Sequence, residues 1–145
     1  MRLQILFLKM KATISETMHD LFSNNQFDAV AQLTTDDIQV INYATGQVFN
    51  GQTEFRDFMS GFKSAFPDLV IHHKNVFQNG NHVALEFEAD GTHTGPLVTP
   101  AGTIPATGKA VKFVVCETHS IRDGKVASIH NYQDSASLMR QLGLM

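Results

Sequence analysis

Glu117 and His119 are the residues of this chain best suited to chemistry. They lie two positions apart in a segment, 111–121, in which apolar and polar residues alternate. Since successive side chains of a strand point to opposite faces, the pattern predicts a strand that carries both residues on one otherwise apolar face. A carboxylate on such a face is costly unless it is hydrogen-bonded. The pair is therefore a candidate for acid–base chemistry, and the alternative is a structural pair that closes one end of the fold.

The sequence does not favour a metal site at this pair. No third ligand lies at a recognisable spacing, and the HExxH and paired CxxC motifs are absent. We therefore expect no metal at this pair. Cys116 falls on the opposite face of the strand without a basic neighbour, so we expect an unreactive thiol. His72 and His73 are adjacent on another predicted strand, where they point to opposite faces and cannot act together on one ligand.

The elements that must position this pair follow a simple order. Helical spacing of apolar residues predicts three helices, over 11–24, 27–33 and, with Thr53 as N-cap, 53–66. Residues 34–37 are predicted as a turn and residues 95–108 as a long loop. The predicted strands cover 38–43, 69–77 and 83–90, followed by a hairpin that turns at Asp123-Gly124 and by a last helix capped by Asp134.

Helices that precede a run of hairpin-linked strands indicate an α+β fold, a strongly bent, mainly antiparallel sheet with helices packed on its concave side. Such a fold leaves a pocket between the helices and the sheet.

The composition bounds the class of protein. The 145 residues are 43% hydrophobic, which suits one domain with a sizeable core. We expect a tail over 1–10 and a single domain over 11–145. A net charge of −3 without a basic cluster argues against a nucleic-acid partner, and no apolar run is long enough for a membrane span. A single cysteine fits a reducing compartment, so we expect a cytoplasmic protein.

Several segments of this chain resemble the SnoaL-like polyketide cyclases of the nuclear-transport-factor-2-like, or ketosteroid-isomerase-like, fold group. They are FDAVAQLTTDDIQV, FNGQTEFRDFMSGFKSAFPDL, DGTHTGP, PATGKAVKF and IRDGKVASIHNYQDSASLMRQLG, and the resemblance covers residues 11 to 143. It implies a cone-shaped barrel, a homodimer formed through the sheet, an apolar pocket and no cofactor. The activity it implies is an intramolecular aldol cyclisation of a polyketide ester, in which a proton leaves a carbon next to a carbonyl group.

The resemblance also implies site residues. The position of the family's acid–base aspartate falls on Asn131, and the partner position falls on Glu117. An amide cannot accept a proton at neutral pH, so Asn131 is predicted to position a carbonyl group while Glu117 acts as the base. We expect burial to raise the pKa of Glu117 into a useful range, with His119 orienting it or acting in its place. The predicted pocket residues are Tyr43, Phe58, Met59 and Phe62, with His93 of the Gly-Thr-His-Thr-Gly turn at the rim.

Three functions remain open at this point. The first is a cyclase- or isomerase-type enzyme with Glu117 as base and a small apolar or polyketide-like substrate. The second is a binding module of the same fold that keeps the pocket but performs no reaction, which Asn131 favours. The third is a scaffold or dimerisation domain whose cavity is filled by side chains, and a buried Glu117 argues against it.

Overall fold

The structure is a computed structural model that describes residues 12–145, and the predicted tail over 1–10 lies outside the described residues. The described helices are α2 (Ile14–Ser23), α3 (Phe27–Gln32), α4 (Gly51–Ala65) and α5 (Ser135–Gln141). The strands are β1 (Thr34–Asn42), β2 (Gln47–Asn50), β3 (Val70–Asn79), β4 (His82–Thr92), β5 (Leu97–Thr99), β6 (Gly102–Ile104), β7 (Ala110–Arg122) and β8 (Lys125–Gln133). This order of elements confirms the predicted α+β class.

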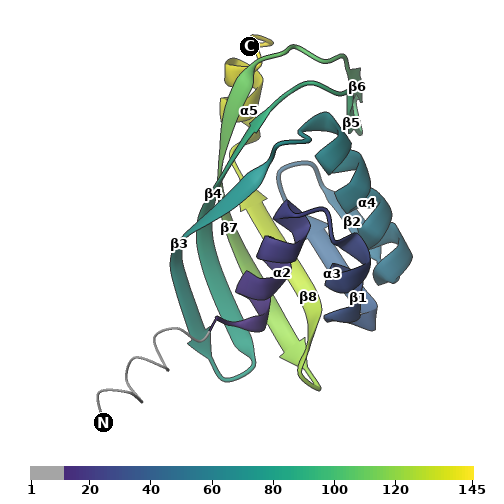
Figure 1. Cartoon of the computed structure of the whole chain (residues 1–145), viewed down its shortest axis with the longest axis vertical. Helices are drawn as coiled ribbons and strands as arrows, with labels where there is room; N and C mark the ends of the chain where they lie inside the picture. The colour runs from purple at the N-terminus through teal and green to yellow at the C-terminus, as the bar shows by residue number, and fades with distance from the viewer. Residues whose placement is uncertain (1–11) are drawn as a thin grey trace.

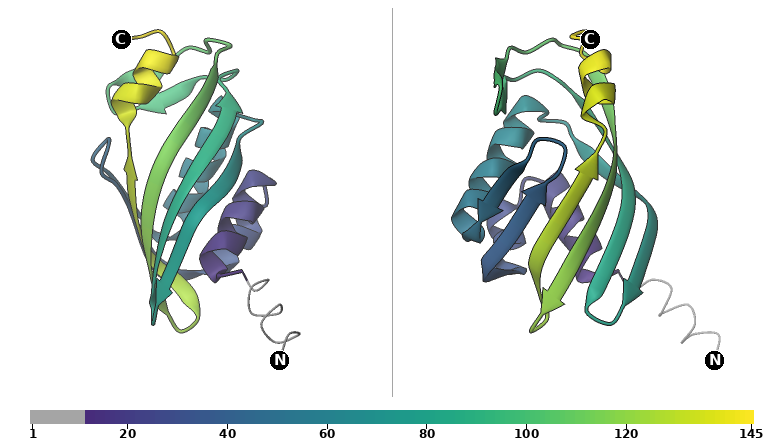
Figure 2. Two further views of the ribbon diagram at one scale, coloured as in Figure 1. Left: turned by 90° about the vertical axis from the view of Figure 1, so that its left-hand side faces the viewer. Right: turned by 180° about the vertical axis from the view of Figure 1, so that it is seen from behind.

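Six of these strands form one curved sheet in the order β2-β1-β8-β7-β4-β3, which Figure 2 shows from two sides. Neighbouring strands are antiparallel except β1 and β8, which run parallel. The register places Glu117 of β7 opposite Leu85 of β4 on one side and opposite Asn131 of β8 on the other. The two acid–base positions that the resemblance implies are therefore cross-strand neighbours.

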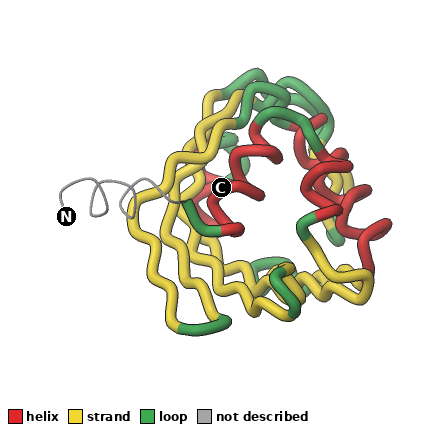
Figure 3. Tube along the Cα trace, turned by 60° about the horizontal axis from the view of Figure 1, so that its bottom comes forward, coloured by secondary structure: helices red, strands yellow, loops and turns green. Residues whose placement is uncertain are grey.

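Helices α2, α3 and α4 lie along one face of the sheet, and α5 packs against β7 near the C-terminus (Figure 1). In Figure 3 the strands curve around one side of the molecule and the helices close the other. The inner face of β7 is buried as predicted, because its period-2 alternation matches the pleat of a half-buried strand. None of the helices over residues 12–145 is long and apolar enough to cross a membrane.

The turn between β7 and β8 also confirms its prediction. Asp123 and Gly124 have φ angles of 53° and 74°. Positive φ at both central residues is what a two-residue hairpin loop requires, and Asp-Gly tolerates it. The turn pairs Arg122 with Lys125, and a one-residue register shift between Ser120 and Ile121 then brings Glu117 opposite Asn131.

Other boundaries differ from the sequence-based expectation. Residues 34–37 belong to β1, whose register against β8 shifts between Thr34 and Gln39, so a strand irregularity rather than a turn accommodates the acidic pair. Helix α4 begins before Thr53: Asn50 is its N-cap, and the Glu54 carboxylate accepts the Asn50 backbone N–H at 2.6 Å. The segment 95–108, predicted as a loop, contains the hairpin of β5 and β6.

Candidate active site

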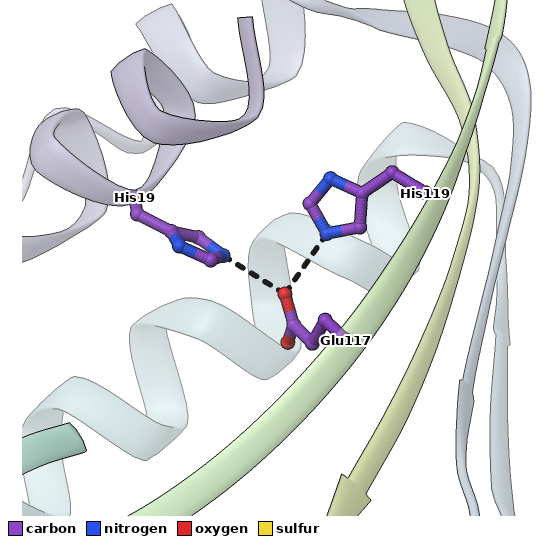
Figure 4. Close-up of side chains that lie close together, drawn as sticks. All are labelled: His19, Glu117 and His119. Carbon is purple, nitrogen blue, oxygen red and sulfur yellow. Dashed lines mark hydrogen bonds and ion pairs between the residues drawn. The ribbon is translucent and has the colours of Figure 1, made fainter. Parts of the chain in front are cut away.

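The centre of the candidate site is the carboxylate of Glu117. Its Oε1 atom lies 2.8 Å from Nε2 of His19 and 2.9 Å from Nε2 of His119 (Figure 4). An ionised carboxylate can only accept hydrogen bonds, so both imidazoles donate to the same oxygen. The second oxygen, Oε2, accepts from Nδ2 of Asn131 at 2.7 Å. The structure thus brings together all three predicted catalytic residues and adds His19.

Each imidazole is also held at its other nitrogen. Nδ1 of His119 lies 2.7 Å from Oγ of Ser15, and Nδ1 of His19 lies 2.9 Å from Nε2 of His73. The rings of His19 and His73 are stacked, with centroids 5.1 Å apart. The cluster therefore runs without a break from Ser15 through the two imidazoles and Glu117 to His73. These contacts orient both rings towards the carboxylate.

Helix α2 brings the residues that were not predicted. It begins with a capping box, in which Thr13 and Glu16 satisfy each other's backbone N–H groups. The positions i, i+3, i+4 and i+7 of a helix lie on one side of it. In α2 this side packs against the sheet. It carries Ser15, Met18, His19 and Phe22. The signal was present in the sequence: two polar residues, Ser15 and His19, lie on an otherwise apolar helical stripe.

The electrostatics of Glu117 differ from the sequence-based expectation. Burial on its own would raise the pKa of the Glu117 carboxyl, but the charge of His19 and the hydrogen bonds from His119 and His19 outweigh it. The pKa of Glu117 is therefore well below its usual range, which corrects the expectation of a raised value. Burial lowers the pKa of His119 and, together with the neighbouring His19, that of His73. At neutral pH the cluster contains an ionised carboxylate held by N–H donors.

A cavity of about 110 Å³ lies beside this cluster, between the helices and the sheet. Its wall is mainly apolar and aromatic, with the rings of Phe22, Phe55, Phe58, Phe62, Phe87 and Phe113. Its polar lining side chains are His19, Asn42, Glu117, Asn131 and Gln133. The Oδ1 atom of Asn131 is buried and has no hydrogen-bond partner among the described residues. The cavity therefore presents one carboxylate, one imidazole and three amides in apolar surroundings.

The predicted pocket residues divide into two groups. Phe58, Met59 and Phe62 of α4 line the cavity. Tyr43 lies elsewhere: it is 50% exposed and stacks on Tyr132 with ring centroids 4.7 Å apart. His93 is fully buried beside Phe66, and its backbone N–H donates to the carbonyl of Lys109 at 2.9 Å.

Tyr43 and His93 thus do not border this cavity. Tyr43 follows the end of β1, where its ring turns outward over the sheet beside Tyr132 of β8. The imidazole of His93 packs on Phe66 and lies 3.0 Å from Oγ1 of Thr107, which joins the two ends of the β5–β6 segment. His93 therefore has a structural role outside the cavity.

The cluster also contains a set of possible metal ligands. One donor atom each of His19, Glu117 and His119 lies within 4.8 Å of the other two, and all three residues are buried. The sequence-based argument against a metal was the lack of a third ligand at a recognisable spacing. The third donor comes instead from helix α2, far from β7 in the sequence, so spacing could not reveal it.

Comparisons with known proteins agree with this fold. The family description "SnoaL-like polyketide cyclase" matches residues 12–142. Among solved structures, TsrD from Streptomyces laurentii is 20% identical with a TM-score of 0.78, over 91% of this chain and 93% of that one. A Catenulispora acidiphila protein with a ketosteroid isomerase-like fold, solved with trimethylamine, is 16% identical with a TM-score of 0.77, over 92% and 96% of the two chains.

A third similar structure is an LEH-like epoxide hydrolase from M. tuberculosis, 17% identical with a TM-score of 0.68, over 89% of this chain and 86% of that one. A search of curated protein sequences gives no match. At these identities the structural likeness establishes the fold alone, and the family match covers nearly the whole chain.

Proposed function

This chain belongs to the SnoaL-like polyketide cyclase family, and from that premise we propose a cyclase- or isomerase-type enzyme that removes a proton from a carbon next to a carbonyl group. The observation that carries the proposal is the position of Glu117. It is the one carboxylate among the residues that line the cavity, and the rest of the wall is mainly apolar. Such surroundings exclude water and hold a substrate carbon close to the base.

The reaction can be written with the groups that line the cavity. The proton passes from the substrate carbon to a Glu117 oxygen, and the electron pair of the broken C–H bond stays on the substrate as an enolate. The N–H groups of the Asn42 and Gln133 amides are available to hold the enolate oxygen. Attack of the enolate on a second carbonyl closes a ring, and reprotonation at another carbon gives an isomer. In both cases Glu117 returns its proton to the product.

His19 and His119 have a supporting role in this proposal. Their hydrogen bonds fix the carboxylate in one orientation and keep it ionised, which a base must be before it accepts a proton. They also make Glu117 a weaker base, since they lower its pKa.

The cavity limits the size of the reacting group. Its volume of about 110 Å³ is below the roughly 150 Å³ of a cavity known to hold benzene. The proposed substrate is therefore a small ketone or ester, or a longer molecule of which only the reacting end enters the cavity.

The experiment follows the proton rather than a particular product. Small ketones and β-keto esters are incubated with the protein in D₂O, and deuterium uptake next to the carbonyl is measured by NMR. We expect the wild type to exchange at least one compound about 100-fold faster than Glu117→Gln does, which is the low end for acid–base catalysis. Glu86→Gln is the matched control, because Glu86 lies on β4 with its side chain exposed on the outer face. Equal exchange in wild type and Glu117→Gln would contradict the proposal.

A binding module without turnover is the second candidate, and one observation favours it. Glu117 already accepts three hydrogen bonds, and its cross-strand neighbour is an amide where the resemblance places an aspartate. This candidate predicts that a panel compound raises the melting temperature of wild type and Glu117→Gln alike, with no exchange in either protein. Melting curves on the same panel therefore separate the two candidates.

A further inference from the structure

We propose that His19, Glu117 and His119 form a binding site for a divalent transition-metal ion, with Zn²⁺ as its best-fitting occupant. Two imidazole nitrogens and one carboxylate oxygen are a known ligand set for catalytic zinc, with water or substrate in the fourth position. This inference goes beyond the proposed function, since it concerns a second state of the same three side chains.

The donor atoms already converge. Nε2 of His19 and Nε2 of His119 both point at Oε1 of Glu117 from different directions, as Figure 4 shows. Zinc–nitrogen and zinc–oxygen bonds of about 2.0–2.2 Å place tetrahedral ligands roughly 3.3 Å apart. All three donor atoms lie within 4.8 Å of one another. The three donor atoms are therefore already close to the separation that a tetrahedral zinc ion requires.

The outer contacts of the cluster also suit a bound metal. A histidine that binds a metal through Nε2 carries its proton on Nδ1 and needs an acceptor there. Oγ of Ser15 stands 2.7 Å from Nδ1 of His119, and Nε2 of His73 stands 2.9 Å from Nδ1 of His19. Both partners can accept as well as donate, so both rings can change tautomer without losing a contact. The Asn131 amide likewise holds the free Glu117 oxygen.

The site would be open on one side. His19 and Glu117 line the cavity, so an ion held between them faces it, and a water molecule or a substrate oxygen can complete the coordination. The three ligands are buried, which favours binding of a charged ion by a charged carboxylate over competition from water. A metal bound to Glu117 occupies the carboxylate, so the loaded protein and the proton-accepting protein are alternative states.

The test measures metal binding directly. The full chain, without an affinity tag, is freed of metal with EDTA, and Zn²⁺ is titrated in by isothermal titration calorimetry. We expect one equivalent of tightly bound Zn²⁺ in the wild type. Ser15→Ala should bind Zn²⁺ about 10–100-fold more weakly, which is the usual effect of removing a residue that hydrogen-bonds to a metal ligand. The ligand variants should lose more affinity than that: His19→Gln, His119→Gln and Glu117→Gln.

The matched control is His72→Gln. His72 lies 3.5 Å from Asp90 and is 53% exposed, so it tests a histidine–carboxylate pair on the surface. Its affinity should equal that of the wild type. If a ligand variant fails to fold, as judged by circular dichroism, the absorption spectrum of the Co²⁺-loaded wild type gives an independent readout, and a four-coordinate spectrum supports the site.

Three results would overturn the inference. The first is that the wild type binds no Zn²⁺ at a protein concentration of about 100 micromolar. The others are that folded His19→Gln binds Zn²⁺ as tightly as the wild type, or that only His72→Gln loses affinity. Because binding and deuterium exchange are separate measurements, either proposal can fail while the other stands.

Discussion

His19 and His119 donate hydrogen bonds to the same oxygen of Glu117, one from helix α2 and the other from strand β7. The other nitrogen of each ring is also hydrogen-bonded, that of His19 to His73 and that of His119 to Ser15. The carboxylate is therefore both ionised and fixed in the cavity wall. The same contacts join α2 to the middle of the sheet, so the cluster contributes to the stability of the fold as well as to its chemistry.

Glu117→Gln should destabilise the protein by about 1–2 kcal/mol, which is the difference between charged and neutral hydrogen bonds at such a site. The loss stays modest because a glutamine oxygen can still accept from both imidazoles. Its new N–H group can donate to the unpartnered Oδ1 of Asn131 if that amide turns over. Urea unfolding measures the change, and exposed Glu86→Gln should stay within about 0.5 kcal/mol of wild type. A more stable Glu117→Gln would show that the ionised carboxylate destabilises the fold.

Asn131→Asp should raise the rate of deuterium exchange about tenfold or more. The substitution places a second carboxylate where Nδ2 of Asn131 now stands 2.7 Å from Glu117. Repulsion between two carboxylates at that distance raises the pKa of one of them, and in its ionised form that group is a stronger base than Glu117 alone. Exchange is followed by NMR against Gln133→Glu, which adds a carboxylate elsewhere on the cavity wall. An equal gain in both variants would indicate a general charge effect and count against a role for position 131.

Two glycine substitutions should change the free energy of unfolding in opposite directions. A Cβ at Gly95 would lie 2.1 Å from the backbone oxygen of Ser64, so Gly95→Ala should destabilise the fold by about 3 kcal/mol, the upper range for overpacking. A Cβ at Gly61 in α4 meets nothing within 4 Å, so Gly61→Ala should stabilise by about 0.5–1 kcal/mol through helix propensity. Urea denaturation of both variants checks the prediction. A neutral Gly95→Ala would mean that the β5–β6 hairpin can move away from α4.

The stability of the protein should fall as the pH drops below about 6.5, the ordinary pKa of histidine. Burial lowers the pKa of His93, His119 and His73 in the folded state. Between the folded and unfolded pKa values, the unfolded chain binds more protons, so acidification favours it. The stabilisation from the neutral rings is complete above pH 6.5 and is lost progressively below it.

His93→Asn isolates one of these rings, outside the Glu117 cluster. The Asn oxygen can still accept from Thr107, so the variant should fold, and its free energy of unfolding should drop less between pH 7.5 and pH 5.5 than that of the wild type. Urea titrations at the two pH values give the comparison. His82→Asn, at an exposed position on β4, should keep the wild-type drop. A wild-type drop in His93→Asn would show that the pKa of this ring is not lowered in the folded protein.

The inner face of β7 could be predicted because it depends on local alternation alone. Glu117 and His119 are buried on that face as expected. The Asp-Gly turn was predicted too, but its register alone would place Glu117 opposite His130, and the register shift between Ser120 and Ile121 makes Asn131 the neighbour instead. The strand face and the turn are each encoded within a few consecutive residues.

His19 and His73 escaped prediction because their role depends on packing between distant segments. Helical spacing predicted a helix here, but it could not tell which strand the apolar stripe of that helix meets. His73 was correctly placed on the face opposite His72, yet nothing local indicated that His19 would stand against it. The effect of two imidazoles on the pKa of Glu117 was hidden for the same reason.

The parallel pairing of β1 with β8 has a consequence for how the chain acquires its structure. β1 is made early during synthesis, but its inner neighbour in the sheet is the last strand of the chain. On the ribosome, the edge of β1 that pairs with β8 therefore stays unpaired until residues 125–133 emerge. Contacts between such distant segments slow folding and prolong exposure to aggregation. The Glu117 cluster, which draws on residues from Ser15 to Asn131, can form only when this closing strand has docked.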